Sequence, residues 1–282
     1  MSAEDILRGA IDTHVHSAPD VIPRKLDDVA LVRQARQAGM RALVLKCHHG
    51  CTCERAYLLN QFLPEVRVFG GLVLNETAGG FNPHAVDAAL RMGATQIWMP
   101  TKSAANHRRH LGGRGGLSIQ EGGRLHENVP VILRLIAEAD AILATGHLSP
   151  EESRILVEEA LAAGVRRISV THPEWGVTAM PVATQMDLAR SGFVYFERCL
   201  VSTRPDLQAT VPFETLARQI REVGVETTIA ATDYGLPQLP TPAEGLAEYA
   251  TRLLRSGFTA SDVTRMIRDN PARLLRLDPI PT

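Results

Sequence analysis

Two histidines near the N-terminus, His14 and His16, stand one residue apart in a β-prone run at residues 11–16. Residues two apart in a strand point to the same side, so both imidazoles would face one way, with Asp12 one step earlier on that face. Two imidazoles on one rigid strand are the beginning of a transition-metal site. A His-x-His pair also occurs among ordinary core or surface histidines, so the interpretation depends on what the rest of the chain adds.

Further apolar runs end in a residue that could join such a site. Lys46 follows an apolar run at 42–45, His147 ends the run at 143–147, His172 ends the run at 169–172, and Asp233 ends the run at 229–233. Several imidazoles and a carboxylate that converge in one cup would hold Zn²⁺, or Mn²⁺ or Fe²⁺, with positions left for water. We therefore predict a metal centre from these strand-terminal groups.

The elements that must position these residues are eight short apolar runs that alternate with helical segments. We expect strands at residues 11–16, 42–47, 67–74, 95–100, 141–147, 167–172, 193–198 and 226–232. Helices are expected to begin near Asp27, Pro83 and Pro150, and to end near Gly39, Gly93 and Gly164. The alternation predicts an α/β fold, a single-domain (β/α)₈ TIM barrel over residues 1–282. An open doubly wound sheet is the alternative, but it would need a glycine-rich phosphate loop after the first strand, and His-Ser-Ala-Pro-Asp stands there instead.

The carboxyl ends of barrel strands are where active sites lie, so the segments that follow them carry the predicted substrate contacts. Residues 101–128 lack clear periodicity and follow the fourth strand, which suggests a lid or binding loop, with glycine-rich disorder as the alternative. Within this segment, Arg108 and Arg109 would suit a substrate carboxylate or phosphate. His48 and Glu197, which follow or end other strands, are further candidates for substrate binding. Ordinary loop hydrogen bonding or a solvated charge is the alternative for each of them.

These motifs together resemble the amidohydrolase superfamily of metal-dependent hydrolases. The resemblance is carried by Asp12-Thr-His-Val-His16, Thr145-Gly-His147, Thr171-His172-Pro173, Thr232-Asp233 and the C-terminal Asn270-Pro-Ala-Arg phrase. It implies a distorted TIM barrel in which His14 and His16 bind the more buried metal with Asp233. It also implies that His147 and His172 bind a second metal or, in mononuclear members, are divided between ligand and substrate contact. Asp233, with His172 beside it, would be catalytic, taking a proton from the metal-activated water.

A lysine bridge is the point at which the chain departs from many members of that superfamily. Members that resemble this chain often carry a carboxylated lysine at the end of the fourth strand, and Lys102 lies slightly past that place. Lys46, at the end of the second strand, has apolar neighbours that would lower its pKa and favour reaction with CO₂. Three possibilities therefore stay open: a bridge from Lys46, a bridge from Lys102, or a mononuclear or water-bridged site.

Composition narrows the classes of partner. Lys plus Arg number 30 and Asp plus Glu 31, so no charged face predicts binding to nucleic acid or to an anionic membrane. No apolar run approaches the ~20 residues of a membrane span, and no secretory signal is recognised, so we expect a cytoplasmic protein. The four cysteines fit no closed zinc motif and are expected to be free thiols. A homo-oligomer is expected only by analogy with such barrels.

The function expected from these residues is hydrolysis of an amide, cyclic amide, lactone or other ester of a small molecule. Two alternatives remain open at this point. The same barrel also supports metal-dependent decarboxylases, lyases and hydratases, and a barrel that has lost its activity would be a non-catalytic binding protein.

Overall fold

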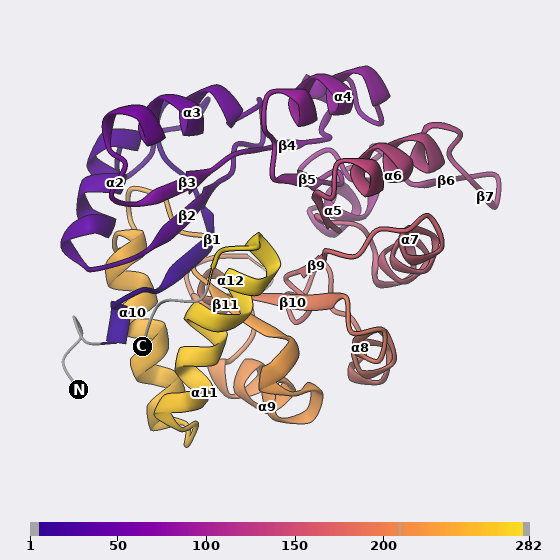
Figure 1. Ribbon diagram of the computed structural model, residues 1–282. Coiled ribbons are helices and arrows are strands. Elements are labelled where there is room, and N and C mark those ends of the chain that lie inside the picture. The colour runs from indigo at the N-terminus through magenta and orange to yellow at the C-terminus, as the bar shows by residue number, and fades with distance from the viewer. Residues whose placement is uncertain (1–5, 209, 279–282) are drawn as a thin grey trace.

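A ring of parallel strands surrounded by helices forms the centre of the molecule (Figure 1). The computed structural model describes residues 6–208 and 210–278. The strands of the ring are β1 (Ile11–Val15), β2 (Ala42–Leu45), β3 (Arg67–Phe69), β4 (Gly71–Val73), β5 (Gln96–Trp98), β8 (Ile142–Ala144), β9 (Ile168–Thr171), β10 (Val194–Cys199) and β11 (Thr228–Ala231). Every expected strand is present, and the (β/α)₈ barrel prediction is confirmed.

The third expected strand, 67–74, is divided into two at Gly70. β3 pairs with β2, and β4 pairs with β5, so this run joins a three-stranded sheet to a six-stranded sheet. The chain passes very close to its neighbours at this point, because a Cβ at Gly71 would lie 2.1 Å from the carbonyl oxygen of Gln96. The division is a distortion of the barrel that a single apolar run did not predict.

Backbone hydrogen bonds close the ring between its first and last strands. The amide of Asp233 donates to the carbonyl of His14 at 2.8 Å, and the amide of His16 donates to the carbonyl of Tyr234 at 2.8 Å. These bonds place the end of β11 directly beside the end of β1. The two ends of the expected motif, His-x-His and Thr-Asp, therefore lie side by side although more than two hundred residues separate them.

The helices pack outside the strands, and their ends follow from local sequence. They are α2 (Asp28–Gln37), α3 (Cys53–Phe62), α4 (Pro83–Arg91), α6 (Asn128–Glu138), α7 (Pro150–Ala162), α8 (Val182–Ala189), α9 (Phe213–Val223), α10 (Pro242–Arg255), α11 (Ala260–Thr264) and α12 (Asn270–Leu275). The side chains of Asp27, Asn82 and Ser149 accept hydrogen bonds from the first turns of α2, α4 and α7. None of the helices in residues 6–208 and 210–278 combines the length and the hydropathy of a bilayer span.

Apolar side chains fill the amino-terminal half of the barrel. Ile11, Ala42 and Ile142, each the first residue of its strand, cluster with Leu274 and Leu275 of α12. The Asn-Pro-Ala-Arg phrase begins that helix. The filled half leaves the carboxyl ends of the strands as the place where polar side chains can meet a ligand.

The segment 101–128 is ordered rather than an unstructured loop. It contains α5 (Ala105–His110) and a small hairpin formed by β6 (Gln120–Glu121) and β7 (Arg124–Leu125). Backbone bonds from Ala105 to Leu117 and from Leu117 to Ser103 fasten it, and Ile119 is completely buried. A helix of six residues is too short to show periodicity, which is why the sequence did not reveal it.

Candidate metal centre

Three side chains meet at the carboxyl ends of β1 and β11. Nε2 of His14 and Nε2 of His16 lie 3.1 and 3.0 Å from Oδ1 of Asp233. From the end of β9, Nε2 of His172 lies 3.4 Å from the other oxygen, Oδ2. Two imidazole nitrogens and a carboxylate oxygen, all within 4.8 Å of one another, form a donor set that suits a divalent transition metal.

His172 and Asp233 reach this point through an unusual backbone conformation. Both have a φ of 53°, in the left-handed region that side-chain-bearing residues rarely adopt. Such a conformation costs on the order of 1–2 kcal/mol and is concentrated at functional sites. His172 directly follows the buried strand β9, and Asp233 follows the buried strand β11 after one residue, so the turn of the backbone directs each side chain over the open end of the barrel.

A buried carboxylate fixes the orientation of His14. Nδ1 of His14 donates to Oε2 of Glu197 at 2.9 Å, and the hydroxyl of Thr13 donates to Oε1 of the same residue at 2.7 Å. With Nδ1 engaged in this way, Nε2 is the nitrogen available for a metal, as in carboxylate–histidine–metal arrangements. The structure gives no support to the prediction that Glu197 binds substrate, because its side chain is buried and occupied by these two partners.

The charges around His14 favour a cation at this position. Burial alone would lower the pKa of His14, but the carboxylates of Asp233 and Glu197 outweigh it and raise that pKa. Burial lowers the pKa of His16 to about 3, so that imidazole is neutral, the form that binds metals. Asp233 is ionised, since His14 and His16 overcome the effect of burial and hold its pKa well below the usual value.

Lys46 is the lysine that touches the donor set. Its Nζ lies 3.0 Å from Nε2 of His14 and 5.7 Å from the centre of the Trp98 ring. Burial lowers its pKa, as its sequence context predicts. Lys102, the other candidate for a bridge, lies farther out in the wall of the cavity.

His147 lies in the same cavity but apart from the donor set. Its Nδ1 is 2.9 Å from Nδ1 of His107, a residue of α5, and its ring centre is 5.6 Å from that of His172. The groups of His, Cys, Asp and Glu side chains that could hold a metal in the described residues do not include His147. That His147 binds a second metal, or contacts the substrate of a mononuclear site, therefore remains a prediction.

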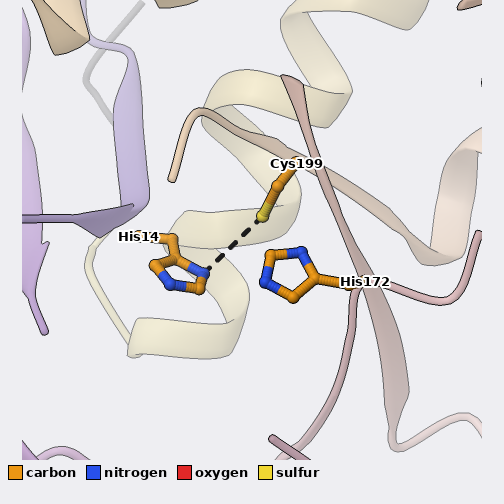
Figure 2. Close-up of side chains that lie close together, drawn as sticks. All are labelled: His14, His172 and Cys199. Atoms are coloured by element: carbon orange, nitrogen blue, oxygen red, sulfur yellow. Dashed lines mark hydrogen bonds between the residues drawn. The ribbon is translucent and has the colours of Figure 1, made fainter. Parts of the chain in front are cut away.

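Cys199, at the end of β10, forms a second cluster with His14 and His172 (Figure 2). Its Sγ lies 3.6 Å from Nδ1 of His14, the nitrogen that already contacts Glu197. Burial raises the pKa of this thiol well above its ordinary value, so the thiolate that a metal needs is disfavoured. We interpret Cys199 as packing beneath the donor set. All four cysteines are free, as predicted.

A cavity of about 390 Å³ opens directly above the donors. His16, His172 and Asp233 line it from below, and Trp175, which follows the β9 end, forms part of its wall. His48 also lines it, and its Nδ1 lies 2.8 Å from the hydroxyl of Thr101. Its expected contact with substrate remains a prediction.

The two arginines expected to bind substrate lie elsewhere. Arg108 pairs with Glu76 at 2.6 Å, Arg109 is exposed, and neither is among the described residues that line the cavity. On α5 it is His107 that faces the cavity, so the next two positions, turned by about 100° each, point away from it. The structure therefore gives no support to the prediction that Arg108 and Arg109 bind substrate.

Arg24 is a residue of the site that the sequence did not reveal. It lines the cavity, and its NH2 group lies 3.2 Å from Nδ1 of His16. Asp20 holds the guanidinium through Nε at 2.8 Å and NH2 at 2.7 Å. The spacing of four residues between Asp20 and Arg24 was visible in the sequence, but nothing there distinguished it from a surface ion pair.

Solved structures of the same fold are enzymes with several chemistries. An amidohydrolase from Pseudomonas aeruginosa is 12% identical with a TM-score of 0.67, and the alignment covers 98% of each chain. A dihydroorotase is 14% identical with a TM-score of 0.63, over 96% of this chain and 70% of that one. A 2,6-dihydroxybenzoate decarboxylase in complex with 2,6-dihydroxybenzoate is 12% identical with a TM-score of 0.55, over 96% of this chain and all 100% of that one. The expected resemblance to the amidohydrolase superfamily is thus confirmed at the level of the fold.

Sequence comparison gives a match to a protein-family profile. No curated protein matches the chain. Residues 9–197, which include β1 to β9 and the first part of β10, match the profile of a family of unknown function, DUF6282. His14, His16, Lys46, His147 and His172 lie within this range. The chain belongs to this family.

Proposed function

We propose that the protein is a metal-dependent hydrolase that cleaves an amide, cyclic amide, lactone or other ester bond of a small molecule. The observation that supports this most directly is the meeting of His14 Nε2 and His16 Nε2 at Asp233 Oδ1, at the floor of an open cavity. His14, His16 and Asp233 would hold the metal, with His172 adjacent. Zn²⁺ is the ion that this set of nitrogen and oxygen donors suits best, and Mn²⁺ and Fe²⁺ are alternatives.

The protein's own residues have distinct parts in this reaction. A divalent metal at these donors would supply Lewis-acid chemistry, polarising a carbonyl group and making water a stronger acid near neutral pH. Asp233 receives the proton of the attacking water at Oδ2, the oxygen that faces His172. Burial lowers the pKa of His172 well below the usual value, so its neutral imidazole can donate a hydrogen bond to Asp233 or to the substrate. Glu197 keeps His14 in the orientation that presents Nε2.

A metal-dependent decarboxylase is the second candidate, because a decarboxylase shares this fold and the same donors would suit it. The two reactions differ in the use of water. A hydrolase places one solvent oxygen in its product, whereas a decarboxylase releases CO₂ and needs no solvent oxygen in the organic product.

Metal removal tests the proposal. The full chain, stripped with a chelator, should lose turnover on a panel of esters, lactones and amides, and added Zn²⁺ or Mn²⁺ should restore it. Asp233→Asn, which keeps the side-chain shape and tolerates the left-handed backbone, should lose about 10²–10⁴-fold in kcat if Asp233 accepts the proton. Products formed in H₂¹⁸O should carry the label. Turnover by a folded, metal-free protein would overturn the proposal, and unlabelled product with CO₂ release would favour the decarboxylase.

A further inference from the structure

The cavity above the donors has a polar side and an apolar side. Trp175, Leu207 and Leu236 contribute apolar surface, while Arg24 and Lys102 contribute positive charge. A ligand that fills this space therefore meets a flat apolar wall and two cations at the same time.

Arg24 is held in place for such a ligand. Its side chain is only 4% exposed, and Asp20 and His16 occupy its Nε and NH2 groups. Its NH1 group has no hydrogen-bond partner in the described part of the chain. The NH1 group of this rigid, buried guanidinium is thus available to a ligand in the cavity. Binding to it costs little conformational entropy, because the side chain is already fixed.

Lys102 supplies a charge that no protein group neutralises directly. The chain has only three lysines, Lys25, Lys46 and Lys102, against a total of 30 basic residues. Lys102 lines the cavity, and within residues 6–208 and 210–278 it forms no ion pair. The positive charge of Arg24 and the negative charges of Asp20 and Asp233 act on it only through space. Its ammonium group is therefore available to an anion.

The two acids that line the cavity, Asp206 and Asp233, and Asp20 behind Arg24 do not offer an equivalent place for a cation. Asp233 faces three histidines at 3.0 to 3.4 Å, and Asp20 is committed to Arg24. Asp206 is exposed at the rim, where water screens its charge. A positively charged ligand would have this one exposed carboxylate, whereas an anion would have Lys102 and the NH1 group of Arg24.

We propose that this site takes a small monocarboxylate with an apolar body, and that Lys102 determines this specificity by binding the carboxylate. Arg24 adds a hydrogen bond from NH1, and the apolar body lies against Trp175. The bond that is cleaved in such a molecule rests on the hydrolase function proposed above. Recognition of the carboxylate does not require turnover and can be measured by binding alone.

Binding of phenylacetate, phenylacetamide and phenethylamine to the metal-loaded full chain tests this specificity. The three probes share a ring and differ in carrying a negative, a neutral or a positive end. The chain has two tryptophans, of which Trp98 is completely buried, so quenching of Trp175 fluorescence reports on the cavity. Trp175→Phe should abolish the signal and confirm its origin.

Phenylacetate is expected to bind roughly tenfold more tightly than phenylacetamide, as for a charge-assisted hydrogen bond in a partly exposed site. Lys102→Met should remove most of that preference and Lys102→Arg should retain it. Lys25→Met is the matched control, because Lys25 contacts the carbonyl of Pro237 and does not line the cavity. Equal binding of acid and amide, or an unchanged preference in Lys102→Met, would overturn the proposal, the latter by showing that Lys102 does not hold the carboxylate. A preference for phenethylamine would also overturn it and assign the specificity to Asp206. None of these results depends on turnover, so a failure here is distinguishable from a failure of the hydrolase function.

Discussion

Replacement of Glu197 should weaken metal binding without removing any metal ligand. Its carboxylate lies 2.9 Å from Nδ1 of His14, and the two side chains are 1% and 0% exposed. A buried hydrogen bond to a charged group contributes about 1.5–3 kcal/mol, which corresponds to roughly 10- to 100-fold in affinity. Partners of this kind, behind a metal-binding histidine, typically change metal affinity by the same factor. We expect Glu197→Ala to weaken Zn²⁺ binding about 100-fold, and Glu197→Gln, which can still accept from Nδ1, about 10-fold.

Competition with a chromophoric zinc chelator measures these affinities, and chemical denaturation shows whether each variant is folded. Thr13→Val is the matched control, since it removes the 2.7 Å bond to Glu197 but leaves the carboxylate on His14. This variant should change zinc affinity by no more than about threefold, the effect of a small neutral hydrogen bond. A folded Glu197→Ala protein with wild-type zinc affinity would refute the assignment of Glu197, as would an equal loss in Thr13→Val.

Two further predictions concern the same end of the barrel. Gly235→Ala should destabilise the fold and weaken metal binding, because its φ is 154° and a Cβ would lie 2.2 Å from the carbonyl oxygen of His16. Overpacking of this kind costs about 1–3 kcal/mol, measurable by denaturation against the control Gly257→Ala, where φ is 91° and no atom lies within 4 Å. Lys46→Ala, prepared from cells grown with bicarbonate, should contain less metal per chain than wild type or Lys25→Ala, as counted by mass spectrometry, if a carboxylated Lys46 serves as a ligand. Unchanged or higher metal content would instead show that Lys46 stays an ammonium group beside His14.

The fold was accessible to sequence reasoning because its determinants are local. Each strand is a short apolar run with its own turn residues, and the helices α2, α4 and α7 begin at side-chain caps that any reader can find. The sequence did not predict the division at Gly70 or the helix α5, for two different reasons. The first depends on which neighbours a strand pairs with, and the second is too short to carry a periodic signal.

The sequence by itself determined which candidate ligand types gather at one end of the barrel, since His14, His16, His172 and Asp233 each lie in or just after a recognisable strand. Only the tertiary structure decided what each of their neighbours contacts. Glu197 is 183 residues from His14 in the chain, and packing of the two strands sets its carboxylate against Nδ1 of His14, whereas the sequence suggested a substrate contact. Likewise, the orientation of α5 places His107 in the wall of the cavity, whereas Arg108 and Arg109 do not line it. Residue type is a local property, whereas the partner of a side chain depends on packing between elements that are far apart in the chain.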